Sequence, residues 1–277
     1  MAVTESTFDQ STTTTMHRVK RVAFYLVVLV TLGIFVFTAG ELLPFLVLGF
    51  TMGAELGIHQ FHVIALASFV AFVTLGVLVQ LYKPETRVAT YQATFLAMAI
   101  LTALSVFTGD LFILLYFVPV ALIGLLHPAG RRLLTIGERY SPAILGLTLV
   151  AAIPLLAYAG NQFQLQATGD EHALFGHYMP MVAIALTILA TGLLVAFESV
   201  GFRLLAWLTG LFAVYVGFAS IVLPTLASSA GTLWGALAIV WAVAFVAATE
   251  LSVRESASSY FSRVRTTREE SVPGKPV

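Results

Sequence analysis

Long apolar runs alternate with short polar connections along most of the chain. Eight of these runs approach or meet the about 20 residues that a helix needs to cross a hydrocarbon core of about 30 Å. The runs predict membrane spans near residues 20–39, 60–82, 88–108, 110–128, 141–161, 177–198, 201–223 and 231–252. The apolar stretch from Glu41 to Gly53 is too short to cross and contains Pro44, so it predicts a short helix at the membrane interface.

The composition agrees with this pattern. Hydrophobic residues make up 59% of the chain and charged residues 10%, and the mean hydropathy is +0.95. These values lie outside the range of soluble globular proteins. The sequence therefore predicts an all-α, polytopic membrane helix bundle of about eight transmembrane helices within residues 18–253. The polar segments 1–17 and 254–277 predict disordered cytoplasmic ends.

The basic residues occur only in alternate connections between the predicted spans. By the positive-inside rule, those connections and both termini are expected in the cytoplasm of a multi-pass cell-membrane protein. The bilayer is then the expected partner, with other membrane subunits or a second copy of the chain as further candidates. A nucleic-acid partner is not expected, because the cations do not form one basic face. The fourteen cations are Arg18, Lys20, Arg21, Lys83, Arg87, Arg131, Arg132, Arg139, Arg203, Arg254, Arg263, Arg265, Arg268 and Lys275.

The opposite side of the predicted bundle receives four of the six histidines and five carboxylates. Glu55, His59 and His62 stand at i, i+4 and i+7, which places them on one stripe of a continuous helix. His172 and His177 are five residues apart, so we expect His172 in a loop and His177 at the start of a span. The full set on this side is His59, His62, His172, His177, Glu41, Glu55, Asp110, Asp170 and Glu171.

The two histidine regions favour an internal duplication, with spans one to four repeated as spans five to eight. When His62 is aligned with His177, Glu55 falls opposite Asp170, because each acid precedes its histidine by seven residues. If the halves pack about a pseudo-twofold axis, His62 and His177 should converge near the outer surface. Carboxylates behind them would orient the imidazoles, as outer-shell groups do in metal sites.

Imidazole and carboxylate ligands without cysteine favour zinc, non-haem iron, manganese or copper(II). Met179 and Met181, beside His177, add copper(I), and two facing histidines, His62 and His177, would also suit a b-type haem. Such a centre predicts redox or hydrolytic chemistry on a membrane-soluble or extracellular substrate. The predicted metal ligands are Glu55, His59, His62, Asp170, Glu171, His172 and His177.

Three other interpretations stay open from the sequence alone. The histidines and acids are also ordinary residues of a membrane interface, or could serve proton-coupled handling of a solute. The protein could equally be a non-enzymatic permease or an accessory subunit of a larger membrane complex. His127, which precedes Pro128 at the opposite side, is expected to cap a helix or to contact lipid headgroups.

In outline, the eight-span, duplicated plan with outward histidines resembles the haem A synthase family, whose halves each carry histidines for haem. That family requires a histidine pair within each half. Here His62 and His177 have no second transmembrane histidine on the same side, and the outer cysteines of many members are missing. The resemblance therefore implies architecture only, and no residue role is carried over from it.

Overall fold

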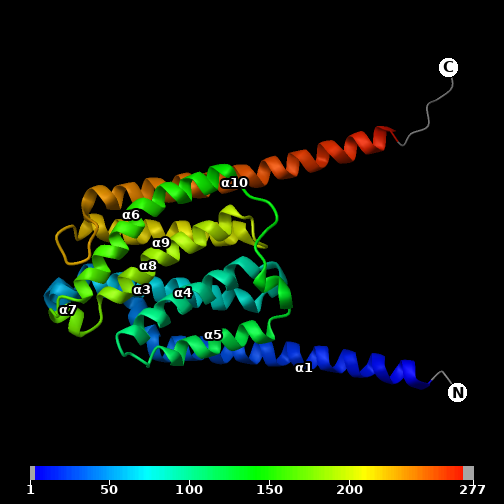
Figure 1. Ribbon diagram of the computed structural model, residues 1–277, viewed down its shortest axis with the longest axis horizontal. Coiled ribbons are helices and arrows are strands. Elements are labelled where there is room, and N and C mark those ends of the chain that lie inside the picture. The colour runs from blue at the N-terminus through cyan, green and yellow to red at the C-terminus, as the bar shows by residue number, and fades with distance from the viewer. Residues whose placement is uncertain (1–3, 271–277) are drawn as a thin grey trace.

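A computed structural model of the chain describes the backbone of residues 4–270 and the side chains of residues 18–255. Within that part the chain is helical and has no strand, which confirms the all-α prediction (Figure 1). The long helices lie side by side and are joined by short connections. They are α1 (Thr4–Ile34), α3 (Gln60–Leu78), α4 (Val88–Phe107), α5 (Leu114–Leu126), α6 (Pro142–Gln166), α8 (Tyr178–Ala196), α9 (Phe202–Val222) and α10 (Gly231–Glu270).

Short helices fill the connections. The segment between α1 and α3, expected to be an interfacial helix, is a series of single turns that packs partly on α3. A four-residue helix, α7, precedes α8. The short elements are η1 (Phe35–Ala39), η2 (Gly40–Leu46), η3 (Leu48–Phe50), α2 (Gly53–Leu56), η4 (Gly57–His59), η5 (Val79–Leu81), η6 (Pro84–Thr86), η7 (Gly130–Leu134) and α7 (Glu171–Leu174).

Seven of the described helical segments are long and apolar enough to cross a membrane. The predicted span 110–128 is represented by α5, which has 13 residues and is therefore only about 20 Å long. The first residues of α1 and the last residues of α10 nevertheless lie at the same end of the bundle (Figure 1). α5 packs beside α1 and returns the chain along the bundle, although it is shorter than the seven candidate spans.

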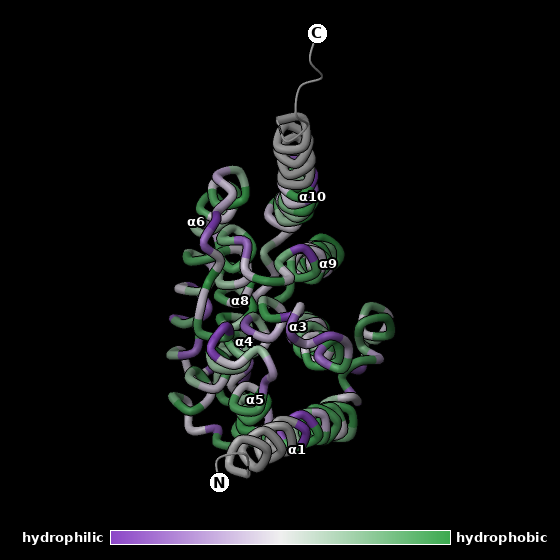
Figure 2. The backbone as a smooth tube through the Cα atoms, turned by 90° about the vertical axis from the view of Figure 1, so that its right-hand side faces the viewer, coloured by the Kyte–Doolittle hydropathy of each residue, from purple (hydrophilic) through white to green (hydrophobic). Residues whose placement is uncertain are grey.

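The helices are arranged around a central group of four. α3, α4, α8 and α9 pack on one another, α1 and α5 cover one side of this group, and α6 and α10 cover the other (Figure 2). α4 packs on α8, and α3 packs on α9. A duplication of α1, α3, α4 and α5 as α6, α8, α9 and α10 makes α3 equivalent to α8 and α4 equivalent to α9. The α4–α8 and α3–α9 contacts are then equivalent to each other, as expected for two halves related by a pseudo-twofold axis.

Glycines allow the closest helix contacts. A Cβ atom on Gly217 of α9 would lie 2.7 Å from the carbonyl oxygen of Gly235 in α10, and one on Gly235 would lie 2.5 Å from that of Gly217. Small residues at such positions let two helix backbones approach in a membrane, where packing rather than hydrophobic burial drives helix association. The α9–α10 pair is therefore held by backbone proximity.

Ion pairs join helices at the end of the bundle that carries the termini. Glu250 of α10 accepts hydrogen bonds from the Nε and Nη2 atoms of Arg203, both at 2.8 Å, and from Nε1 of Trp207 at 2.9 Å. Arg21 of α1 donates to Glu85 at 2.9 Å. Part of the basic set that defines the predicted cytoplasmic side thus also ties neighbouring helices together.

The two end helices extend into segments for which the sequence predicts disorder. α1 begins at Thr4 and α10 ends at Glu270. Residues 1–3 and 271–277 lie outside the described part of the chain.

Candidate functional site

Four imidazole rings meet at the end of the bundle opposite the termini. The ring centroid of His59 lies 4.8 Å from those of His172 and His177, and that of His62 lies 4.8 Å from His172 and 5.4 Å from His177. We call these four residues the histidine cluster. Two of its members come from each half of the chain, as the predicted convergence of His62 and His177 requires.

A break in the helix positions the first pair. α2 ends at Leu56, Gly57 adopts a φ of +52°, and α3 begins only at Gln60. Glycine suits this turn because a Cβ atom disfavours positive φ. The continuous helix expected through Glu55, His59 and His62 is therefore absent, and the predicted stripe is wrong. Glu55 is exposed on α2, while His59 and His62 turn toward the second half.

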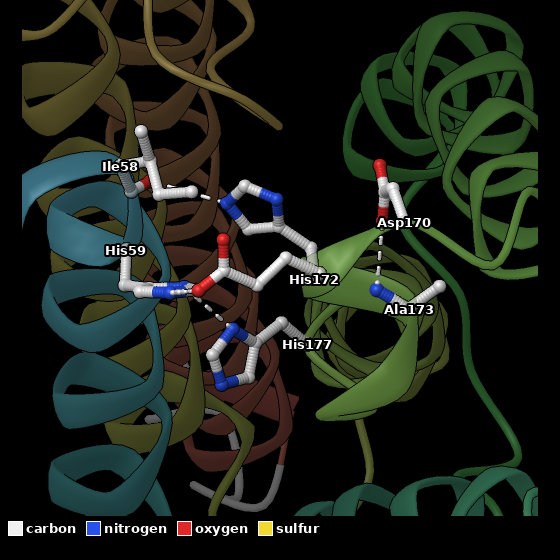
Figure 3. A network of polar contacts seen from close by, with 7 residues as sticks. Ile58, His59, Asp170, His172, Ala173 and His177 are labelled. Carbon is white, nitrogen blue, oxygen red and sulfur yellow. Dashed lines mark hydrogen bonds and ion pairs between the residues drawn. The ribbon is translucent and has the colours of Figure 1, made fainter.

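The short helix α7 positions the second pair. Asp170 is its N-cap: one carboxylate oxygen accepts the backbone N–H of Ala173 at 2.8 Å (Figure 3). The other oxygen accepts the hydroxyl of Tyr178, also at 2.8 Å. These two donors hold the pKa of Asp170 below its usual value. His172 lies in α7, and His177 is the residue before α8, as predicted. Asp170 thus orders the loop, and its two oxygens face the cap and Tyr178.

His59 and His177 are in direct contact between their ring nitrogens. The two Nδ1 atoms are 3.1 Å apart, and Nε2 of His59 lies 3.4 Å from Oε1 of Glu171 (Figure 3). A carboxylate accepts only, so Nε2 of His59 carries the hydrogen and its Nδ1 is a lone pair. Nδ1–H of His177 is then the donor between the two rings.

The ring of His172 is oriented by a hydrogen bond to a backbone carbonyl oxygen. Its Nε2 donates to the carbonyl oxygen of Ile58 at 3.2 Å (Figure 3). Because a carbonyl oxygen has no hydrogen to give, Nε2 of His172 is protonated, and in the neutral ring Nδ1 is a lone pair.

His62 is buried, with 3% of its surface exposed, and bonds to a residue far away in the chain. Nε2 of His62 lies 2.8 Å from Oγ of Ser228, and that hydroxyl donates to Oε1 of Gln162 at 2.5 Å. Since the only hydrogen of the hydroxyl is used on Gln162, His62 is the donor to Ser228. Its Nδ1 atom is buried and has no partner among the described residues.

The surroundings favour uncharged rings. Burial, followed by the proximity of His59 and His172, lowers the pKa of His177 to about 4, although Glu171 acts in the opposite direction. The imidazolium form is disfavoured because it would lose hydration and face neighbouring imidazoles. His177 is therefore neutral at pH 7, the form in which an imidazole binds metal.

Five of the seven predicted metal ligands lie together: the four histidines and Glu171. Asp170 is adjacent but engaged in the α7 cap, and Glu55 is elsewhere. Among the side chains that the structure describes, no group of three or more His, Asp or Glu is arranged to hold a metal ion as it stands. The closest approach to a bidentate site is the pair of Nδ1 atoms of His59 and His177.

His127, at the other end of the bundle, has a structural role. It is fully buried, its Nε2 lies 3.2 Å from Oε1 of Gln80, and its Nδ1 accepts the backbone N–H of Ala129 at 3.1 Å. Its position after the last residue of α5 agrees with the predicted cap, but the predicted lipid contact is wrong because Phe24 and Tyr91 cover the ring. Burial lowers the pKa of His127 to about 4.

Three residues of the site escape sequence reasoning: Tyr158, Gln162 and Ser228. They lie in α6 and in the α9–α10 connection, with no spacing that links them to the histidines. The only signal was a run of amide side chains at the end of α6, which includes Gln162. Comparison with family models, curated proteins and solved structures finds no match for this chain. The outline resemblance to haem A synthases therefore finds no support in these comparisons.

Proposed function

We propose that this multi-pass protein of the cell membrane binds a divalent transition-metal ion at the histidine cluster. The observation that supports this most directly is the pair of Nδ1 atoms of His59 and His177, 3.1 Å apart and supplied by the two halves of the chain. Two imidazole nitrogens bound tetrahedrally to zinc at about 2.05 Å lie roughly 3.4 Å from one another. A small separation of the two rings, with the hydrogen of His177 moved from Nδ1 to Nε2 so that both Nδ1 atoms present lone pairs, would therefore admit an ion.

The hydrogen bonds around the cluster favour the same use. His59, His62 and His172 each donate Nε2–H to an oxygen, of Glu171, Ser228 and Ile58 respectively. Metal-binding histidines commonly donate the second ring nitrogen to a carboxylate, carbonyl or other oxygen, which fixes the ring and the tautomer. Nδ1 of His62 and Nδ1 of His172 are the candidates for a third and a fourth ligand.

A small ion suits the cluster better than haem. Two histidines that bind one haem iron stand on opposite faces of a flat macrocycle. Here the rings are packed together, with centroids 4.8 to 6.1 Å apart in five of the six pairs. A haem would have to separate all four.

The surroundings favour a membrane-soluble substrate for the bound ion. Leu174 and Phe175, beside the cluster, are mostly exposed, and the Phe175 ring stacks on His177 with centroids 5.7 Å apart. An ion with a free coordination position there would polarise a substrate or an attacking water for hydrolysis, or exchange electrons if it is redox active. The competing class is a permease or an accessory subunit, which needs no ion.

Metal titration of the detergent-purified protein tests the proposal. We expect one Co²⁺ or Zn²⁺ ion per chain, with a cobalt absorption spectrum that indicates nitrogen ligands. His59→Ala and His177→Ala should abolish this spectrum, and Glu171→Gln should weaken affinity by about 10- to 100-fold. His127→Gln is the matched control and should bind as the native protein does. A native protein that binds no ion, or variants that bind equally well, would refute the site and favour the non-enzymatic class.

A further inference from the structure

Ser228 occupies an unusual place in the connection between α9 and α10. It is buried, and its backbone φ is +65°. A side chain with a Cβ atom disfavours this left-handed region, and glycine or asparagine is more usual there. A serine held in this conformation requires surroundings that fix it.

Those surroundings are hydrogen bonds from two other helices. The hydroxyl of Ser228 joins His62 of α3 at 2.8 Å to Gln162 of α6 at 2.5 Å. The carbonyl oxygen of Ser228 accepts the hydroxyl of Tyr158, one turn earlier in α6, at 2.7 Å. Both polar ends of Ser228 are thus held by α6 while its hydroxyl faces a histidine of the cluster.

The direction of these bonds determines the tautomer of His62. Gln162 offers an oxygen, which only accepts, and therefore takes the single hydrogen of the Ser228 hydroxyl. The hydroxyl has only lone pairs left for His62, so that ring must present Nε2–H. The remaining lone pair, on Nδ1, is buried and has no partner among the described residues.

We infer that Ser228 is a positioning residue of the histidine cluster: together with Gln162, it fixes the His62 tautomer that leaves Nδ1 free to bind an incoming ligand. For a metal ion as the ligand, the inference rests on the proposed function. The tautomer itself does not, and it exists in the ion-free protein. A serine that only shaped the α9–α10 connection would leave the His62 tautomer unchanged when its hydroxyl is removed.

The tautomer is measured on ion-free protein labelled with ¹⁵N-histidine, by the nitrogen chemical shifts of the His62 ring. The native ring should be protonated on Nε2 alone. Ser228→Gly removes the hydroxyl but suits the positive φ, so the fold should persist while the ring becomes a mixture of tautomers. Gln162→Leu frees the serine hydrogen to donate to Nε2 and should move the ring proton to Nδ1. Gln162→Glu keeps an acceptor oxygen and should restore the native pattern.

The same variants are then titrated with Co²⁺. Ser228→Gly and Gln162→Leu should bind about 10- to 100-fold more weakly than the native protein, and Gln162→Glu close to normally. Native tautomers in Ser228→Gly and Gln162→Leu would overturn the inference, whatever their affinity. A native protein that binds no ion while the tautomers change as expected would refute the proposed function and leave the positioning role of Ser228 standing.

Discussion

At the scale of single residues, the cluster contains an imidazole, that of His177, that stays neutral where a free histidine would begin to gain a proton. Burial and neighbouring rings lower the pKa of His177 from 6.5 to about 4. The titratable groups facing it are His59, His62, His172 and Glu171, of which only the carboxylate favours the charged ring. At mildly acidic pH, His177 therefore releases a proton when the protein folds.

Acidification should consequently destabilise the fold. Between about pH 6.5 and about pH 4 the unfolded His177 is protonated and the folded one is not. Protonation of His177 therefore does not reduce the free energy of unfolding above pH 6.5 and reduces it progressively as the pH falls through this range. His127 should contribute with the same sign, because its pKa is also lowered to about 4. Thermal unfolding in detergent from neutral to acidic pH should show a falling midpoint.

His177→Gln should make that decline shallower, because its contribution to the slope is removed. An unchanged slope in His177→Gln would show that the ring is not held neutral. The comparison needs only the ion-free protein, so a bound metal does not enter it.

Sequence reasoning found the histidines of this cluster but not the groups that orient them. Because the basic residues occur only in alternate connections, the sequence predicted that His59, His62, His172 and His177 lie on one side of the membrane. The structure brings their rings together. Ser228 and Gln162 could not be found in this way, because a hydrogen bond between residues 66 positions apart leaves no periodic trace. Glu55 was misplaced because the spacing rule assumes an unbroken helix, which Gly57 interrupts.

At the scale of helices, hydrophobic length predicted the spans well and local backbone chemistry set their ends. α5 starts at Leu114, later than predicted, because Asp110 accepts the backbone N–H of Phe112 at 2.9 Å and forms a turn. It stops at Leu126 because the residue before a proline, here His127, avoids the helical conformation. These effects shorten the predicted 110–128 span from both ends.

Close backbone approach between α9 and α10 makes their glycines sensitive to any side chain. Gly217→Val should drive its side chain into the carbonyl oxygen of Gly235, at 2.7 Å from the Cβ position. Overpacking of this kind costs about 1–3 kcal/mol, or a fall in the unfolding midpoint of about 2–8 °C at this chain length. Thermal unfolding of the detergent-purified variant measures it.

Gly146→Val and Gly160→Val on α6 are matched controls, because a Cβ atom at either position meets no atom within 4 Å. Both should unfold close to the native midpoint. Equal losses at all three sites would mean that the valine itself, rather than the α9–α10 contact, lowers stability.

At the scale of the whole molecule, the two ends of the bundle differ in chemistry. The termini and the ion pairs of Arg21 and Arg203 lie at one end, and the histidine cluster lies at the other. By the positive-inside rule we expect the first end in the cytoplasm. The absence of cysteine from the chain makes this orientation simple to test with single substitutions.

Leu174→Cys and Leu134→Cys form a matched pair, because both leucines are highly exposed, at 79% and 88%, and lie at opposite ends of the bundle. In intact cells, an impermeant thiol reagent should modify Leu174→Cys, beside the histidine cluster, and should spare Leu134→Cys until the membrane is opened. The reverse pattern would invert the orientation and place the cluster in the cytoplasm.

Since α3 and α8 belong to different halves of the chain, the four imidazoles come together only when those halves pack against each other. A ligand bound by these four histidines would contact both halves of the chain at once. Ligand binding and association of the two halves are then thermodynamically linked. If the chain were cut between α5 and α6, the ligand that binds the intact protein would also promote association of the two fragments.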